Sequence, residues 1–183
     1  MENYLGSIKK QFLYYKLLGE KAMEQLTEEQ LFWKFNEESN SIAILAHHIA
    51  GNMLSRFTDF LTTDGEKDWR NRDAEFINSF SNELELKNYW NKGWNCLLNT
   101  LDQLSEKDLE KIIHIRNDGH TVKEAINRQL AHYAYHIGQL VFIAKMLKNE
   151  TWNTLTIARS KSQDYNNRKF SQEKSKRHYT DDI

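Results

Sequence analysis

Apolar side chains recur at steps of three and four residues along four long stretches of this chain, and this period limits the fold more than any other feature. The stretches cover residues 4–26, 41–63, 81–104 and 121–148. Such a period places one apolar stripe along a helix, and each stripe must be buried against another element. The chain has no proline and only 7 glycines, so it lacks the turn residues that many short strands require. We therefore predict an all-α fold, a four-helix bundle.

The segments between these stretches predict the connections of the bundle. Thr27 followed three residues later by Gln30 forms a capping-box pattern, so a short helix is expected there. About 20 residues separate the second and third long helices, and we expect a long crossover connection instead of a tight turn. Residues 109–121 alternate weakly and contain Asp118-Gly119, which predicts an extended stretch with a turn, a small hairpin arm.

Charge divides the chain into an acidic body and a basic end. Between Arg159 and Arg177, seven Lys or Arg residues stand against two acids, and because the whole chain carries −1, the remainder carries about −6. We expect residues 1–158 to form one helical domain and residues 159–183 to form a polar basic tail, extended or partly disordered. An anion or nucleic-acid binder acting through this tail is an alternative function, although such tails more often only aid solubility.

Cysteine content and hydropathy restrict the compartment. Cys96 is the only cysteine, so no disulfide within the chain and no zinc site built on cysteines can form. The first ten residues lack the apolar segment of a secretory signal, and no run of 18 apolar residues occurs that would span a membrane. We expect a cytoplasmic protein without a membrane partner.

Two histidines four residues apart are the first candidates for a functional site. His132 and His136 lie in the last amphipathic stretch, and residues at this spacing share one face of a helix with Cβ atoms about 5–6 Å apart. Both imidazoles can then reach one ion at about 2.0–2.1 Å. Tyr133 follows the first histidine where the HExxH metalloproteases have glutamate, so that class is excluded. The pair alone is more often structural than metal-binding.

A third histidine brings the two interpretations to near parity. His48 lies on the apolar side of the second stretch with Leu45 and Ile49, whereas its neighbour His47 points about 100° away around the helix. In a bundle His48 can face the pair across the interior, and three protein ligands with one open position are typical of catalytic sites. Periodicity favours His48 over His47 only modestly, and buried, hydrogen-bonded core histidines remain the alternative.

Two segments of the sequence resemble the DinB superfamily, also called the YfiT-like metalloenzymes. They are "SIAILAHHIAGNM" and "HTVKEAINRQLAHYAYHIGQL", which together supply a histidine before Ile-Ala and an HxxxHxxQ pattern. The resemblance covers about residues 4–165. It is nearest to a branch described only as a domain of unknown function, and residues 52–76 look like that branch's connection after the second helix.

The resemblance implies a four-helix bundle with an unusual connection order and one divalent metal ion, nickel or zinc, held by three histidines. Carried over by motif, these ligands are His48, His132 and His136. It also implies a homodimer and a small-molecule substrate. Relatives include thiol-dependent transferases and isomerases, so a low-molecular-weight thiol is a candidate cosubstrate, and other members are called hydrolases by analogy. A metal-stabilised dimer module without catalysis is the alternative.

Three further residues are candidates for supporting roles. Asn52 and Arg56 follow His48 by four and eight residues, so they could orient an anionic substrate at the mouth of the site. For Arg56 an ordinary salt bridge is slightly favoured. Gln139, three residues after His136, could support that ligand from behind or form an interhelical hydrogen bond.

Overall fold

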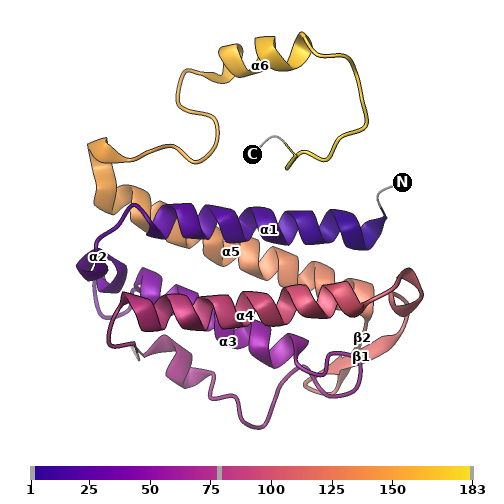
Figure 1. The fold of residues 1–183 in the computed structure, drawn as a ribbon. Coiled ribbons are helices and arrows are strands. Elements are labelled where there is room, and N and C mark those ends of the chain that lie inside the picture. The colour runs from indigo at the N-terminus through magenta and orange to yellow at the C-terminus, as the bar shows by residue number, and fades with distance from the viewer. Residues whose placement is uncertain (1–2, 78–79, 182–183) are drawn as a thin grey trace.

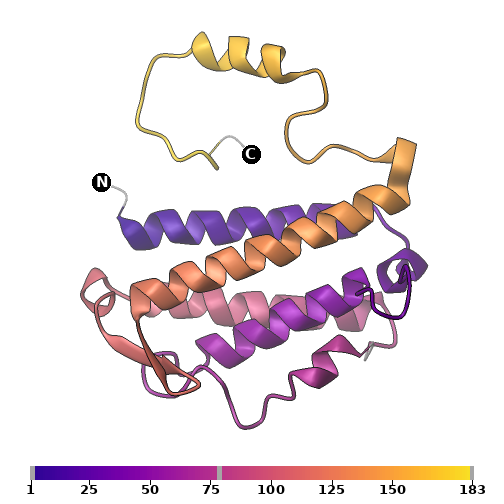
Figure 2. The ribbon, with the colours of Figure 1, turned by 180° about the vertical axis from the view of Figure 1, so that it is seen from behind.

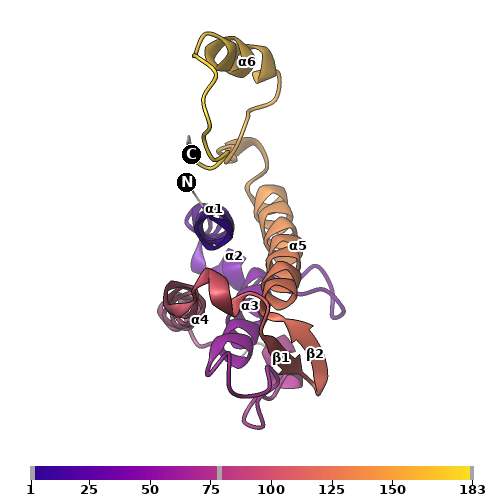
Figure 3. The same ribbon diagram turned by 90° about the vertical axis from the view of Figure 1, so that its right-hand side faces the viewer.

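Four long helices pack around a shared core in the computed structural model, which describes residues 3–77 and 80–181 (Figure 1). They are α1 (Tyr4–Met23), α3 (Ile42–Phe57), α4 (Glu83–Gln103) and α5 (Val122–Lys148). Helix α1 packs against α5, and α3 packs against both α4 and α5. Figure 2 shows the same bundle from behind, and Figure 3, which looks along the helices, shows α3 next to α4 and α5. The prediction of a mostly helical chain is confirmed, and the packing of these helices agrees with the predicted bundle.

Local sequence signals determine where most of these helices begin. The side chains of Ser41 and Asn82 each accept a hydrogen bond from the third backbone N–H of the helix that follows, which satisfies a donor with no partner inside the helix. Complete capping boxes open the short helix α2 (Glu28–Phe32) at Thr27 and helix α5 at Thr121. The predicted short helix after Thr27 is therefore confirmed.

The second long helix is shorter than its apolar period predicts. We expected it to extend to residue 63, but α3 ends at Phe57 and Asp59 adopts a positive φ of 48°. The apolar period includes Phe60, whose ring is buried by folding back onto Phe57 with the ring centroids 5.2 Å apart. A turn thus buries the side chain that, in the sequence, suggested one more helical turn.

Helix α3 is the central element of the fold. All of its residues except His47 are buried. At the crossing of α3 and α4, a Cβ atom on Gly93 would lie 2.6 Å from the Cα atom of Ala50, which is closer than real Cβ contacts allow. The two backbones can approach this closely because Gly93 has no side chain. The core is completed by large rings from α4 and α5, including Trp90, Trp94 and Tyr133.

The prediction of an all-α chain is wrong in one detail, because a two-stranded sheet joins α4 to α5. Strands β1 (Ile112–Ile115) and β2 (Asp118–Thr121) are antiparallel, with Ile115 opposite Asp118. The two turn residues, Arg116 and Asn117, have φ values of 56° and 66°, as tight hairpin turns require. The hairpin arm expected from residues 109–121 is confirmed. The 3-10 segment η2 (Glu106–Asp108) precedes it.

The long crossover from α3 to α4 is attached to this hairpin. The side chain of Asp64 accepts hydrogen bonds from the backbone N–H groups of Arg116 and Asn117, at 2.8 and 2.9 Å. Burial opposes the charge of Asp64, but these backbone donors prevail and lower its pKa to about 2. Farther along, the 3-10 segment η1 (Asp73–Phe76) packs against α3. The crossover therefore passes beside the middle of α3.

The end of the chain lies along α1, on the side of the bundle opposite the crossover (Figure 1). After α5 come the 3-10 segment η3 (Asn149–Thr151) and the helix α6 (Ser162–Phe170). The last two residues of the basic tail lie outside the described residues. None of the helices in the described part of the chain combines the length and the hydropathy needed to cross a bilayer.

Candidate metal centre

Helix α5 brings two imidazole rings together. His132 and His136 are one turn apart, and their Nε2 atoms are separated by 3.1 Å. Both rings are half-buried, so each has one edge in the protein and one in a cavity. The regular, capped helix α5 fixes this pair without contributions from distant segments.

Helix α3 places His48 against this pair. The Nε2 atom of His48 lies 3.3 Å from that of His132, and its ring centroid lies 4.9 Å from that of His136. Each of the three rings offers a nitrogen within 4.8 Å of the other two. His47, which the sequence left as an alternative, is turned toward Phe80 and Tyr89, with ring centroids 4.8 and 5.0 Å away.

A buried carboxylate orients His48. Oε2 of Glu75 lies 2.9 Å from Nδ1 of His48, and Arg70 donates to both carboxylate oxygens at 2.7 and 2.8 Å. Burial of Glu75 favours its neutral form, but the hydrogen bonds from His48 and Arg70 outweigh burial and lower its pKa. Glu75 is therefore a carboxylate, which can only accept a hydrogen bond, so Nδ1 of His48 donates the proton. In the neutral imidazole, Nε2 of His48 then presents a bare lone pair.

The fit of Glu75 against α3 depends on a glycine. A Cβ atom on Gly51 would lie 2.5 Å from Oε1 of Glu75, so any larger residue there would displace the carboxylate. Sequence reasoning missed Glu75, because a short 3-10 segment in a crossover has no periodic pattern that would mark one residue as buried. The only signal was Glu75 itself, five residues after Arg70 in "WRNRDAEF", and many exposed loops contain such pairs.

Gln139 orients His136 in a similar way. Its Oε1 atom lies 2.9 Å from Nδ1 of His136, so Nδ1 donates the hydrogen bond and Nε2 is left with its lone pair. Two of the three converging Nε2 atoms therefore carry no proton. His132 could donate a proton from its Nε2 atom to only one of them in a well-aligned hydrogen bond.

The surroundings of His132 and His136 favour uncharged rings. Burial lowers the pKa of His132 to about 3, helped by the neighbouring His136, His48 and two arginines. Burial also lowers the pKa of His136, against the effect of its hydrogen bond to Gln139. Metal ions bind the neutral form of imidazole, so this environment favours coordination over protonation.

The distances fit a single ion. Two nitrogens that each lie about 2.0–2.1 Å from a tetrahedral ion are about 3.3 Å apart. The separations of 3.3 Å from His48 to His132 and 3.1 Å from His132 to His136 are close to this value. The three histidines therefore lie close enough together to bind one metal ion.

One family model matches almost the whole helical body of this chain. It is described as "Protein of unknown function (DUF1572)", and it covers residues 1–161. The chain belongs to this family. No curated protein matches it.

The three histidines of this DUF1572 protein line one end of a cavity of about 360 Å³. Asn52 and Arg56 line the same cavity, but both also have partners in the protein. Oδ1 of Asn52 accepts a hydrogen bond from the buried hydroxyl of Tyr133 at 2.9 Å. Nη1 of Arg56 donates to the backbone oxygen of Gly65 and lies 3.1 Å from Oε2 of Glu66. Gln139 faces a neighbouring apolar pocket instead.

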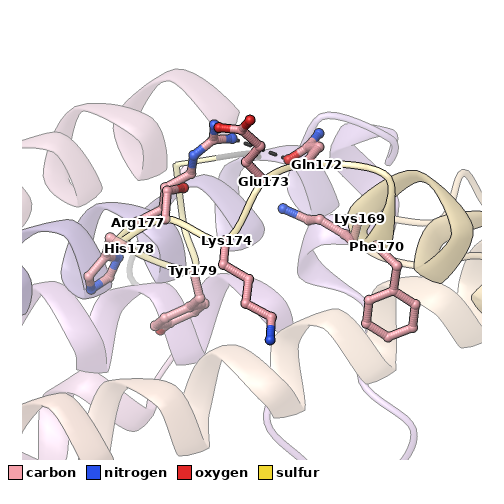
Figure 4. Close-up of a pocket in the computed structure, with 9 residues that line it drawn as sticks. Lys169, Phe170, Gln172, Glu173, Lys174, Arg177, His178 and Tyr179 are labelled. Carbon is pink, nitrogen blue, oxygen red and sulfur yellow. Dashed lines mark hydrogen bonds between the residues drawn. The ribbon is translucent and has the colours of Figure 1, made fainter.

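The basic tail of the DUF1572 protein takes no part in this cavity. Nε2 of His178 lies 3.1 Å from the hydroxyl of Ser7, and the ammonium group of Lys10 donates to Asp181 at 2.6 Å, so the tail is attached to α1. Figure 4 shows the hollow inside the tail, where side chains such as Lys174 and Arg177 surround a separate space. No described residue beyond Lys148 lines the histidine cavity.

Proposed function

We propose that this protein is a metal-dependent enzyme of the DinB superfamily, with that superfamily's type of four-helix bundle. Its ligands are His48, His132 and His136, and they hold one divalent ion, zinc or nickel. The substrate is a small molecule, and the reaction is a hydrolysis or a transfer involving a low-molecular-weight thiol. The resemblance in the two histidine motifs supports the superfamily, and the geometry of the three rings supports the metal.

The observation that carries the proposal is the convergence of three Nε2 atoms, two of which belong to rings whose Nδ1 atoms are engaged by Glu75 and Gln139. Lone pairs that face one another at 3.1 and 3.3 Å repel unless a cation or a proton lies between them. The one ring proton of neutral His132 can lie toward only one of its two neighbours, and its low pKa, caused by burial, opposes a second proton at neutral pH. Imidazole ligands suit zinc and nickel, and a buried carboxylate behind a ligating histidine is a common support of metal sites.

Some residues around the site would orient the metal ligands, and others would contact the substrate. Glu75 and Gln139 hold the rings of His48 and His136 at fixed angles. Asn52 and Arg56 contribute polar groups to the wall of the cavity. When bound, the ion supplies Lewis acidity, which polarises a substrate oxygen and eases the deprotonation of water or a thiol.

Elemental analysis of protein purified without a histidine tag tests the proposal. We expect about one zinc or nickel ion per chain, and its loss in the variants His132→Ala and His48→Ala. The variant His47→Ala is the matched control, since that ring lies on the same helix but faces Phe80 and Tyr89. Wild-type protein that binds neither ion on titration would refute the proposal. Metal retained in His48→Ala and lost in His47→Ala would show that the ligand was misassigned.

If the protein binds a metal ion, activity assays are needed to identify the reaction that it catalyses. Metal-loaded protein would be assayed for hydrolysis of small esters and amides and for transfer of thiols to electrophiles. Turnover that the His132→Ala variant lacks supports an enzyme, whereas stoichiometric metal with no turnover supports a metal-stabilised module. The homodimer implied by the resemblance and the cytoplasmic location expected from the sequence composition are part of the proposal, and light scattering in solution tests the first.

A further inference from the structure

Arginine dominates the cavity above the three histidines. Arg56, Arg70, Arg72, Arg116 and Arg128 all line it, and no Asp or Glu is among the described residues that do. We propose that the cavity binds the oxyanion of a small substrate, a carboxylate or a phosphate group, and that Arg72, Arg116 and Arg128 hold it. This inference rests on the proposed function only in calling the bound molecule a substrate.

Two of the five arginines are internal supports of the site. The guanidinium of Arg70 is buried and forms a two-pronged pair with Glu75. Arg56 is also buried, and its Nη1 atom is engaged with Gly65 and Glu66. These side chains keep the wall of the cavity in place, although Nε of Arg56 has no hydrogen-bond partner among the described residues.

The other three arginines are accessible. The side chains of Arg72 and Arg116 are 51% and 57% exposed, and Arg128 is exposed as well. Within the described ranges, the polar partner of Arg128 is a ring nitrogen of His120 at 3.4 Å, which carries no negative charge to balance the guanidinium. Arg72 lies over the ring of Phe76, and its nearest carboxylate, Asp73, is 3.8 Å away and almost fully exposed.

The cavity has an excess of positive charge. Glu66 lies within hydrogen-bonding distance of three guanidinium groups, those of Arg56, Arg70 and Arg116, so one carboxylate is shared among three cations. Glu75 is the other carboxylate in close contact with an arginine of the cavity. With Asp73, which lies 3.8 Å from Arg72, three carboxylates lie beside the five guanidinium groups, so about two positive charges are in excess. Cations gathered in a concave, partly desolvated site attract an anion.

The fold fixes the accessible arginines near the histidines. Arg128 precedes His132 by four residues, so it lies on the same face of α5, one turn before the metal ligands. Arg116 lies in the hairpin turn, where Asp64 binds its backbone N–H at 2.8 Å. Arg72 immediately precedes η1, the segment that supplies Glu75. Three separate elements thus bring guanidinium groups to one opening.

Two unpaired polar atoms add to the case. In the described part of the chain, three buried side-chain atoms have no hydrogen-bond partner, and two of them, Nε of Arg56 and Oε1 of Gln129, belong to residues that line this cavity. A buried polar group without a partner is destabilising, because it has lost its hydrogen bonds to water and gained none in the protein. Such a cost is expected at a site where a polar ligand completes the hydrogen bonding.

Size and donor type define the class of ligand. A volume of about 360 Å³ lies near the lower end of small-molecule sites, which span roughly 300–1,000 Å³. Guanidinium groups match the planar edge of a carboxylate and the oxygens of a phosphate. A long polyanion would instead need cations spread along an open surface. The structure therefore favours a small molecule with one or two acidic groups.

Calorimetric titration at low ionic strength tests the inference. The probes are inorganic phosphate, succinate and the neutral analogue succinamide, each titrated into metal-free protein so that no ion can bind the anion. We expect phosphate or succinate to bind and succinamide not to bind. The variants Arg116→Gln and Arg128→Gln each weaken anion binding about tenfold, since one charge-assisted hydrogen bond is lost. Binding of phosphate alone indicates a phosphorylated substrate, and binding of succinate alone indicates a carboxylic acid.

The variant Arg159→Gln is the matched control, because that arginine is exposed but lies outside the cavity. It should bind the anions like the wild type. The inference is overturned if neither anion binds at millimolar concentration, if succinamide binds equally well, or if all three variants behave alike. Tight binding of an oligonucleotide that phosphate cannot displace also overturns it. The guanidinium groups of Arg116 and Arg128 contact Glu66 and His120, not the three site histidines, so their variants should keep the metal content of the wild type. Measuring metal on these variants therefore distinguishes failure of the anion proposal from failure of the metal proposal.

Discussion

Replacing Glu75 by glutamine tests the central physical claim, that a buried carboxylate holds the metal ligand His48 in its working orientation. Glu75 is 3% exposed, and it accepts hydrogen bonds from Nδ1 of His48 and from two nitrogens of Arg70. Glutamine has nearly the same shape but no charge, and one of its two terminal atoms is a donor. It can accept from His48 or from Arg70, and its NH₂ group faces a donor in either case.

Glu75→Gln should lower both the stability of the protein and its affinity for the metal. Removing one partner of a buried ion pair costs about 3–5 kcal/mol, and we expect the lower end because glutamine retains one acceptor. For a chain of this size, about 3 kcal/mol lowers the melting temperature by roughly 6–12 °C. Loss of the support behind a ligating histidine costs about 10–100-fold in metal affinity. Both losses should appear together in Glu75→Gln.

Thermal unfolding and competition with a zinc chelator measure the two parts separately. Glu66→Gln is the matched control, because Glu66 also lies beside Arg70, at 3.3 Å, but has no hydrogen bond to a histidine. We expect Glu66→Gln to lose stability while its zinc affinity stays within about threefold of the wild type, since no ligand support is removed. Wild-type zinc affinity in Glu75→Gln, or an equal loss in both variants, would refute the assigned role of the carboxylate.

Three further results are expected. Gly93→Ala should lose about 2–3 kcal/mol in urea unfolding because its Cβ would lie 2.6 Å from Cα of Ala50, whereas Gly138→Ala, with no atom within 4 Å, should gain up to about 1 kcal/mol. Folding lowers the pKa of His132 from 6.5 to about 3, so below pH 6.5 the unfolded chain binds a proton that the folded chain does not. The free energy of unfolding of the metal-free protein should therefore be constant above pH 6.5 and fall as the pH falls toward 3. The loss at pH 5 is about 2 kcal/mol before screening and about 1 after it, and equal urea midpoints at pH 7 and pH 5 would contradict this. Deleting residues 162–183 should change the free energy of unfolding by less than about 1 kcal/mol, because the ion pair of Lys10 with Asp181 is partly exposed. The metal content should stay unchanged, and loss of metal on deletion would show that the tail supports the site.

The regular parts of the fold could be predicted because their signals are local. The apolar period of α5 and the capping box at Thr121 lie within the helix that they specify, and the two histidines follow from its period. The hairpin was expected from Asp118-Gly119, although the residues with positive φ are Arg116 and Asn117. The end of α3 was misplaced, because Phe60 continues the helical period in the sequence while a turn buries it in the fold.

The surroundings of the histidines could not be predicted, because they depend on contacts across the chain. Glu75 reaches His48 from 27 residues away, through a crossover whose path no local pattern determines. The five arginines of the cavity are scattered from residue 56 to residue 128, and only the packing of η1 and the hairpin beside α3 and α5 brings them together. Arg56 was named from its spacing to His48, but the structure shows it engaged with Gly65 and Glu66.

The burial of α3 on nearly every side has a consequence for how this family can diversify. A helix enclosed by its neighbours tolerates few changes of side-chain volume, so substitutions in the helix that carries His48 would destabilise the whole domain. The exposed positions of the crossover and the hairpin, such as Arg72 and Arg116, can accept new side chains at lower cost. Members of the family should therefore differ first in these two loops, while the interior helix that carries His48 remains unchanged.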